Sequence, residues 1–343
     1  MKYLVCGDVH WCQYSSILRA RGRKYSVRLE NLIRSVNWVE ELAAKKGCIG
    51  VIYLGDFFDR PDLNAEELTA LQEVKWANLK HIFIVGNHES NVLNLSFSST
   101  KLFESIDAMV INKPSHFDVN DKITFNFIPY ILPSELKPLS EYVSGDKKNV
   151  VFAHEDIAGI QYGKITSVQG FDINDIENNC TLFIDGHLHN GGMIGKNIIL
   201  AGNLTGQNFN ENAQLFSHNV YIIDIDDDSI VINTYENKEA LKFYKLKIES
   251  DLDIEQIKSL PKNSVVSISC NNLYKDLVLK VINNNDNILD SRMSIYYIDN
   301  MNSEEERADF EVKDHFEQFI LFAKSKLNPS PILDDELSRL KGS

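Results

Sequence analysis

The sequence predicts an α/β fold, arranged as a layered sandwich rather than as a single doubly wound sheet. Strand-like runs alternate with helical patterns over about the first hundred residues, and strand-like runs then dominate up to about residue 235. After about residue 245 the pattern changes to a smaller β-α-β unit, followed by a charged, helical C-terminal stretch. A chain of 343 residues is long enough for a full core and for two domains.

Composition narrows the class of protein. The hydrophobic content of 43% and charged content of 24% are ordinary for a soluble globular protein, and no apolar run is long enough to predict a membrane span. The five cysteines have no CxxC spacing and the N-terminal apolar run is too short for a signal peptide. We therefore expect free thiols and a cytoplasmic location, or the host cytoplasm if a phage encodes the chain. The net charge of −14 argues against a protein that coats nucleic acid.

The elements of the first hundred residues follow from residue type. Runs rich in β-branched and aromatic residues predict short strands at 3–6, 51–54 and 82–85. Residues 28–46 carry apolar side chains at three- and four-residue steps, which predicts an amphipathic helix that ends at Gly47. Asn64 is the expected N-cap of a second helix, because Glu67 stands at the capping-box position.

The later elements are mainly strands. They are predicted within 110–132 and at 150–153, 182–184, 198–200, 220–225 and 230–234. A small β-α-β unit is then predicted from runs at 265–269, 273–282 and 293–298. From residue 303 a charged stretch leads into a helix with one apolar stripe, and a shorter helix follows it.

Five of the predicted strands end in polar clusters. In chain order the clusters are Asp8 with His10, Asp56, Asn87 with His88, His154, and His187 with His189. In open α/β sheets ligands bind outside the carboxyl ends of the strands, where such side chains converge. Each cluster alone could be a solvated turn with a side-chain cap. Recurrence at five strand ends has no structural cause of its own, so the ordered set predicts a metal site.

The predicted ligands offer oxygen and nitrogen but no thiolate, and they are too many for one ion. They suit two divalent first-row metals such as manganese, iron or zinc. Two such ions about 4 Å apart can clamp a phosphate for in-line displacement.

These motifs together resemble the signature of the calcineurin-like metallophosphoesterases over roughly residues 1–235. The resemblance implies a four-layer α/β/β/α sandwich with a small α+β capping domain and a C-terminal helical segment. Within the superfamily, Gly-Asp-Phe-Phe-Asp-Arg-Pro at 55–61 resembles the SbcD type of DNA-repair nuclease. That type includes the small subunit of phage recombination endonucleases and the eukaryotic Mre-eleven nuclease.

The resemblance also implies a role for each site residue. One metal would be held by Asp8, His10, Asp56 and His189. The other would be held by Asp56, Asn87, His154 and His187, so that Asp56 bridges. Manganese is the first choice, with magnesium, iron and zinc as alternatives.

Three further residues receive roles from the same resemblance. His88 corresponds to the catalytic histidine, which stabilises the transition state or protonates the leaving oxygen. Glu89, where many relatives have Asp, is expected to orient His88. Asp59 replaces a histidine of some relatives and is expected to be a supporting or capping carboxylate.

The resemblance divides the chain into a metallophosphoesterase domain at 1–245, a capping or DNA-binding domain at 246–302 and a helix-loop-helix at 303–343. It implies 3′-to-5′ exonuclease and single-strand endonuclease activity in double-strand-break repair and recombination. The expected partners are DNA and, through 303–343, an SbcC-type coiled-coil ATPase. No membrane partner is expected, and homodimer formation is left open.

Five basic residues follow the first motif and are either DNA contacts or part of a solvated loop: Arg19, Arg21, Arg23, Lys24 and Arg28. Two other readings of the chain compete with the nuclease. The first is a phosphoesterase acting on small nucleotides or phosphoproteins. The second is a non-catalytic scaffold, which predicts eroded ligands, whereas every expected ligand is present. The C-terminal apolar stripe could equally pack on the chain's own core.

Overall fold

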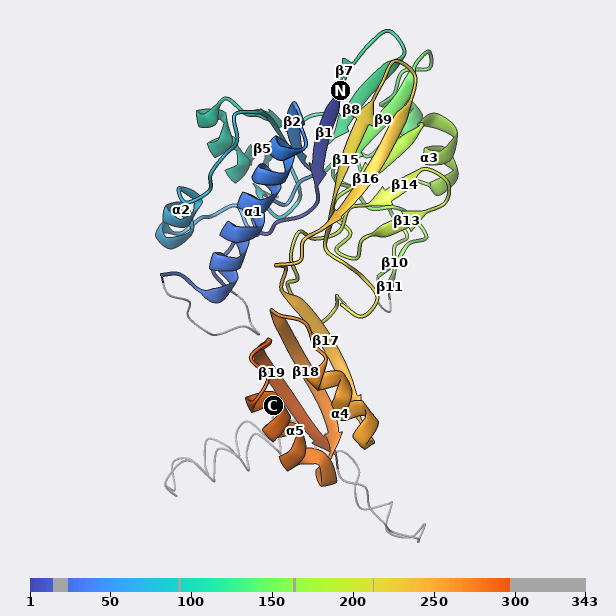
Figure 1. Cartoon of the computed structure of the whole chain (residues 1–343). Helices are drawn as coiled ribbons and strands as arrows, with labels where there is room; N and C mark the ends of the chain where they lie inside the picture. Colours follow the sequence, from blue (N-terminus) through green and yellow to red (C-terminus); the bar gives the residue numbers. More distant parts are fainter. Residues whose placement is uncertain (15–23, 92–93, 163–164, 212, 297–343) are drawn as a thin grey trace, which may run out of the picture. The chain divides into compact units, whose positions relative to one another are not determined.

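The structure is a computed structural model that describes residues 1–14, 24–91, 94–162, 165–211 and 213–296 (Figure 1). The chain divides into two units, Met1–Tyr296 and Tyr297–Ser343. The helices predicted within 303–343 therefore lie outside the described residues. Among the described residues, no helix combines the length and apolar character needed to span a membrane.

The first sheet has six strands in the order β16-β15-β1-β2-β3-β6. Strands β1, β2, β3 and β6 are parallel to one another, and β15 and β16 form an antiparallel hairpin beside β1. Their bounds are β1 Lys2–Cys6, β2 Gly50–Tyr53, β3 Lys80–Ile84, β6 Met109–Ile111, β15 Asn219–Ile225 and β16 Ile230–Glu236. All the strands predicted from the sequence for this part of the chain are present.

The second sheet also has six strands, in the order β13-β14-β12-β9-β8-β7. Its four central strands are parallel, and the two edge strands are antiparallel to their neighbours. Their bounds are β7 Ser115–Asp118, β8 Ile123–Ile128, β9 Lys148–Ala153, β12 Leu182–Asp185, β13 Gly192–Ile194 and β14 Ile198–Leu200.

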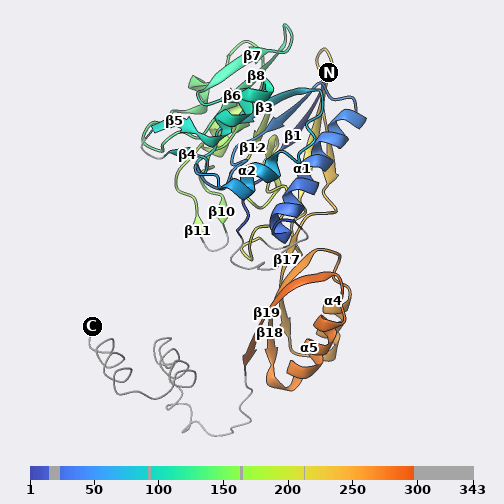
Figure 2. The same ribbon diagram turned by 90° about the vertical axis from the view of Figure 1, so that its left-hand side faces the viewer.

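Helices cover the outer sides of the two sheets. Helix α1 (Val27–Lys45) begins at Ser26, whose side chain accepts a hydrogen bond from the Leu29 N–H. Helix α2 (Ala65–Leu71) has the capping box that the sequence predicted, since Asn64 and Glu67 each bond the other's backbone N–H. Helix α3 (Ile173–Asn179) lies beside the second sheet, and Figure 2 shows α1 and α2 beside the first.

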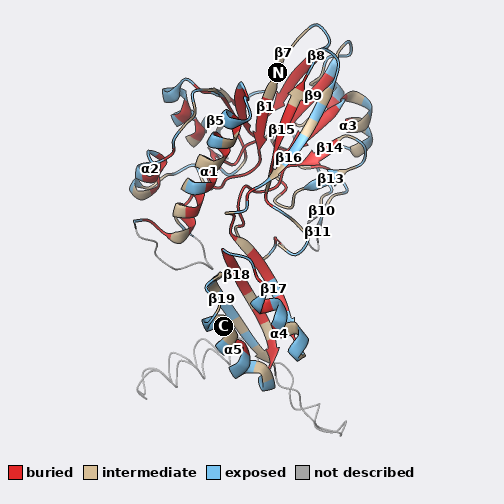
Figure 3. Ribbon diagram, viewed as in Figure 1, coloured by how far each residue is buried: buried red, intermediate tan, exposed pale blue. Residues whose placement is uncertain are grey.

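Three apolar clusters hold the layers together. One joins the inner face of α1, for example Leu32 and Val36, to the first sheet. A second lies between the sheets, where Val5 of the first meets Phe152 of the second. The third joins Ile176 of α3 to the outer face of the second sheet. The predicted four-layer α/β/β/α sandwich is confirmed, and the buried strands stand out in Figure 3.

Several short elements complete the described part of the chain. They are strands β4 Ser90–Asn91, β5 Asn94–Ser98, β10 Gln161–Tyr162 and β11 Ile165–Thr166, with 3-10 turns at Ser99–Ile106, Leu139–Glu141 and Asn272–Tyr274. Strands β4 and β5 pair as a hairpin directly after the segment that carries Asn87 and His88.

A small α+β module follows the second sheet. Its parallel sheet has the order β17-β18-β19, and helices α4 and α5 pack on one face. The bounds are β17 Lys242–Ile248, α4 Asp251–Lys258, β18 Ser264–Asn271, α5 Lys275–Asn283 and β19 Ile288–Tyr296. The predicted β-α-β unit corresponds to β18, α5 and β19, whereas the sequence reading missed β17 and α4.

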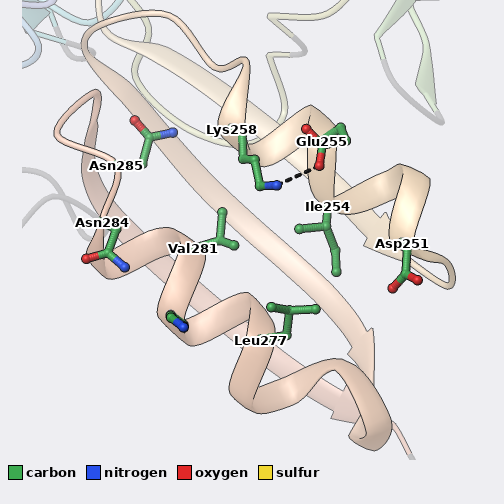
Figure 4. Close-up of a pocket in the computed structure, with 9 residues that line it drawn as sticks. Asp251, Ile254, Glu255, Lys258, Leu277, Val281, Asn284 and Asn285 are labelled. Carbon is green, nitrogen blue, oxygen red and sulfur yellow. Dashed lines mark hydrogen bonds and ion pairs between the residues drawn. The ribbon is translucent and has the colours of Figure 1, made fainter.

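The module has a groove of about 650 Å³ between α4 and α5 (Figure 4). Its wall includes an exposed ion pair, in which the Lys258 ammonium lies 2.6 Å from the Glu255 carboxylate. Among its described lining residues there is none of the predicted site residues. This groove is therefore separate from the predicted metal site.

Candidate metal centre

The predicted ligands meet because their strands end at the same edges of the two sheets. Asp8 follows β1, Asp56 follows β2, and Asn87 follows β3 in the first sheet. His154 follows β9 and His187 follows β12 in the second. Since both sheets are mainly parallel, these carboxyl ends converge on one place.

A first ligand group consists of Asp8, His10 and His189. The Nε2 atoms of His10 and His189 lie 3.1 Å apart. The Asp8 Oδ2 atom lies 3.6 Å from the His10 nitrogen and 3.8 Å from the His189 nitrogen. Three potential donor atoms therefore surround one point, in buried or half-buried surroundings.

A second ligand group consists of Asn87, His154 and His187. The Asn87 Oδ1 atom lies 3.1 Å from His154 Nε2 and 3.1 Å from His187 Nδ1. The three donor atoms again converge on one point, beside the first group.

Asp56 lies between the two groups. Its Oδ2 atom is 3.9 Å from His10 Nε2 and 3.3 Å from His154 Nε2. Its other oxygen accepts a hydrogen bond of 2.9 Å from the His88 backbone N–H. A carboxylate in this position can serve both groups, which is the arrangement that the resemblance implied for a bridging ligand.

The chemistry of the cluster fits divalent cations. Asp8 Oδ2 is buried and has no hydrogen-bond partner among the described residues, so one lone pair is available to a cation. Burial alone would lower the pKa of His10, but contacts with Asp59 and Asp8 raise it to about 10. The carboxylates therefore attract positive charge strongly, whether from a proton or from a metal ion. Donors of oxygen and nitrogen suit first-row divalent metals.

The second ring nitrogen of each histidine ligand also has a partner. The His154 Nδ1–H group donates a hydrogen bond to the Leu54 carbonyl at 2.8 Å, so the lone pair of Nε2 can bind a metal ion. His10 Nδ1 lies 3.2 Å from Asp59 Oδ1. His189 Nδ1 lies 3.5 Å from Glu211 Oε1, and His187 Nε2 lies 3.5 Å from Asp156 Oδ1. Such partners fix the tautomer and orientation of metal-binding histidines.

Sequence reasoning missed Glu211. It is buried, and its carboxylate accepts hydrogen bonds of 2.8 Å from Asn203 Nδ2 and 3.0 Å from the Gln207 N–H. It lies in a loop after β14 and not directly after a strand. Because the sequence signal used was polar residues at strand ends, nothing marked this glutamate.

The surroundings of His88 correct one prediction. Its Nδ1 atom lies 3.1 Å from the Asp59 carbonyl oxygen and 3.9 Å from Asp59 Oδ1. Glu89, which was expected to orient His88, instead accepts hydrogen bonds from the backbone N–H groups of Phe58 and Gly86, at 3.0 and 2.8 Å. Burial, and then the charge of Asp56, raise the pKa of Glu89 to about 8. Asp59 therefore takes the place expected for Glu89.

Two glycines of the motifs are required by space. A Cβ atom on Gly86 would lie 2.2 Å from Asp56 Oδ1. A Cβ atom on Gly55 would lie 2.3 Å from His154 Nδ1, and Gly55 also has a left-handed φ of +103°. The Gly-Asp and Gly-Asn pairs thus allow the backbone to approach the ligands closely.

The predicted DNA-contacting residues are placed differently from one another. Arg28 is 2% exposed, and its guanidinium donates to the carbonyls of Gly206 and His10 at 3.2 and 3.1 Å. It is an internal support of the His10 backbone, so its prediction as a DNA contact is wrong. Lys24 is exposed and forms an ion pair with Glu73. Arg19, Arg21 and Arg23 lie outside the described residues.

Comparison with known proteins gives a family match. The sequence model of the calcineurin-like phosphoesterases matches residues 1–191. The phosphoesterase 244L of Invertebrate iridescent virus 6 is 23% identical over 185 residues, which are 52% of this chain. The matched stretch spans 59% of the length of that viral relative.

Two solved structures are similar in part. A dimetal phosphatase from Danio rerio covers 69% of this chain and 96% of its own, at 14% identity and a TM-score of 0.43. An archaeal phosphodiesterase covers 68% of this chain and 100% of its own, at 13% identity and a TM-score of 0.33.

Proposed function

Since this chain belongs to the calcineurin-like phosphoesterase family, we propose that it is a two-metal-dependent phosphodiesterase whose substrate is DNA. The observation that carries the proposal is the pair of ligand groups that share Asp56. The motif at residues 55–61, which resembles that of the SbcD and Mre-eleven nucleases, favours DNA as the substrate.

The two ligand groups give the substrate phosphate a defined place. When bound, two divalent cations supply Lewis-acid charge for the phosphoryl oxygens and for an attacking water. Asp8 and Asp56 neutralise part of that charge. Because the donor atoms are held by Asp59, Glu211, Asp156 and the Leu54 carbonyl, little reorganisation is needed when the phosphate arrives.

His88 is suited to act on the leaving oxygen. Its side chain is 43% exposed, in contrast to the buried His10 and His154. With Nδ1 held by the Asp59 carbonyl, Nε2 is the ring nitrogen that can donate a proton to substrate. The Asp59 carboxylate, whose Oδ1 atom lies 3.9 Å from His88 Nδ1, helps to hold the ring in this orientation.

We extend the proposal to the partners. An SbcC-type coiled-coil ATPase would dock on residues 303–343, and the basic residues Arg19, Arg21 and Arg23 would contact the DNA backbone. Deletion of 303–343 should then abolish ATPase binding and leave metal-dependent hydrolysis intact. Charge reversal at Arg21 and Arg23 should weaken DNA binding and flatten its salt dependence. Unchanged binding would remove these residues from the DNA site.

A second candidate is a phosphoesterase that acts on small nucleotides or phosphoproteins. One observation favours it: of the predicted basic contacts that the structure describes, Arg28 is buried and Lys24 is paired with Glu73. This candidate predicts faster turnover of a nucleotide monoester than of DNA.

The deciding experiment is degradation of end-labelled linear DNA in manganese, with the wild type, His88→Ala and a chelator control. His116→Ala is the matched control, because His116 is an exposed histidine on β7. The proposal expects metal-dependent degradation that only His88→Ala loses. If DNA survives while bis(p-nitrophenyl) phosphate is still hydrolysed, the DNA assignment is wrong and the second candidate replaces it.

A further inference from the structure

A separate pocket lies at the carboxyl ends of the strands that flank the metal-bearing ones. Its volume is about 440 Å³, within the range of small-molecule sites. Its walls include two tyrosines, a proline, two asparagines and a lysine, which are Tyr130, Tyr142, Pro114, Asn94, Asn112 and Lys113.

The topology puts this pocket next to the metal centre. Strand β6, which leads to Asn112, pairs in parallel with β3, which leads to Asn87. Strand β8, which leads to Tyr130, pairs in parallel with β9, which leads to His154. The pocket therefore lies at the same edge of each sheet as the metal ligands, one strand further along.

Backbone hydrogen bonds confirm this closeness. The Tyr130 N–H donates to the Val85 carbonyl at 2.9 Å, two residues before Asn87. The Ile131 N–H donates to the Glu155 carboxylate, one residue after His154. Burial, and then the charges of Glu155, Asp156 and Asp56, raise the pKa of the Tyr130 hydroxyl. The two hydrogen bonds join the pocket to the segments that carry Asn87 and His154.

The lining matches the chemistry of a nucleobase. The half-buried Tyr130 ring offers a stacking surface, and base-aromatic stacking is tolerant of sequence because every base has a π face. Tyr142 is anchored as a wall, because its ring contacts Phe171 and its hydroxyl accepts from the Lys137 N–H at 3.1 Å. The Asn112 amide can both donate to and accept from a base edge. Lys113 is exposed and can neutralise a neighbouring phosphate.

We propose that this pocket is a nucleobase subsite, which holds a base of the substrate while its phosphate lies at the two ligand groups. The inference rests on the proposed function, since it names the part of a nucleotide that the site recognises. Tyr130 would stack on the base and thereby lower KM for substrates that carry one.

The test compares two chromogenic diesters that differ in the base. They are the p-nitrophenyl ester of thymidine 5′-phosphate and the base-free bis(p-nitrophenyl) phosphate, both with the manganese-loaded full chain. Tyr130→Ala should raise KM for the thymidine ester roughly 10-fold, as expected from loss of one stacked base. It should leave kcat for both esters, and KM for the base-free ester, within about twofold. Tyr130→Phe, which keeps the ring, should behave as the wild type.

Tyr235→Ala on β16 is the control, because Tyr235 is also a half-buried tyrosine but does not line the pocket. Equal changes on the two esters would assign Tyr130 a structural role and overturn the subsite, as would no change on either. If Tyr130→Ala does not fold, Asn112→Ala takes its place and the same comparison decides.

The outcomes separate this inference from the proposed function. Wild type that degrades DNA with no effect of Tyr130→Ala on the thymidine ester overturns the subsite alone. Wild type that spares DNA but shows a Tyr130-dependent preference for the thymidine ester supports the subsite and overturns DNA as the substrate. Absence of any preference for the thymidine ester in the wild type overturns the subsite and counts against a nucleic-acid substrate.

Discussion

The two ligand groups differ in the charge of the side chains that form and support them. The first group has its own carboxylate, Asp8. The Nδ1 atoms of its two histidines lie next to two further carboxylates, those of Asp59 and Glu211. The second group has the neutral amide of Asn87 in place of a carboxylate, and His154 donates a hydrogen bond to a backbone carbonyl. Because negative charge adds to the affinity for a divalent cation, the first group should hold its ion more tightly. When both groups are loaded, the centre would thus hold one ion firmly and exchange the other more readily.

The largest effect is expected where the two groups meet. Asp56→Asn removes the charge that both share and should lower hydrolysis at least roughly 1000-fold. Calorimetric titration with manganese should then show weaker binding at both steps. Asp107→Asn is the matched control, since Asp107 also has a left-handed backbone, with φ of 61°, and lies outside both groups. Selective loss of one ion would contradict the shared role of Asp56.

His88 tests whether catalysis can be separated from ion binding. His88→Ala should lower kcat about 100- to 1000-fold, because a general acid is lost, while both ions bind as in the wild type. The measurement is kcat for a diester together with the manganese stoichiometry. Loss of an ion in this variant would show that His88 is a metal ligand, and it would then be counted in the first group.

Glu211 and Asp156 allow the two groups to be compared directly, since each supports one histidine of its group. Glu211→Gln should weaken binding of one ion by about 10-fold, within the range for such supporting contacts. Asp156→Asn should have a smaller effect, because its side chain is 32% exposed against 6% for Glu211 and is better screened. Manganese affinities of both variants, with exposed Glu104→Gln as control, decide the order. Equal losses would contradict the difference between the groups.

The smallest expected effect concerns pH. Burial lowers the pKa of His218 from 6.5, and the nearby charges are those of Glu211, Glu236 and Lys242. Below pH 6.5 the unfolded chain binds a proton at His218 that the folded chain refuses, so stability falls as pH decreases. For one group the slope is at most about 1.4 kcal/mol per pH unit.

His218→Gln should therefore flatten the fall of the free energy of unfolding between pH 6.5 and 5.5, measured by urea denaturation in the absence of metal. His116→Gln, at an exposed position, should leave the slope as in the wild type. An unchanged slope in His218→Gln would mean that groups other than His218 determine how the free energy of unfolding depends on pH in this range.

The sequence alone predicted the features that depend on local pattern. Strand-terminal polar residues identified Asp8, Asp56, Asn87 and His154 because parallel strands bring their carboxyl ends together whatever the loops do. The capping box at Asn64 and Glu67 was equally readable, since all its contacts lie within four residues.

What sequence reasoning missed depends on long-range packing. Glu211 reaches His189 from a loop whose path no periodicity encodes. Arg28 looked like a surface base because it follows a basic run, yet its side chain is buried against the His10 carbonyl. Glu89 and Asp59 exchanged their expected roles because the turn after Gly86 directs the glutamate toward backbone N–H groups.

The backbone at the ligands has a consequence for the stability of this chain. His10, Asp56 and His187 have φ angles of 49°, 44° and 52°, in the left-handed region that costs a non-glycine residue roughly 1–2 kcal/mol. Replacement of any of them by glycine would relieve that strain but would also remove a side chain of the ligand groups together with its contacts. The positions that carry the predicted chemistry are therefore also positions where the fold stores backbone strain.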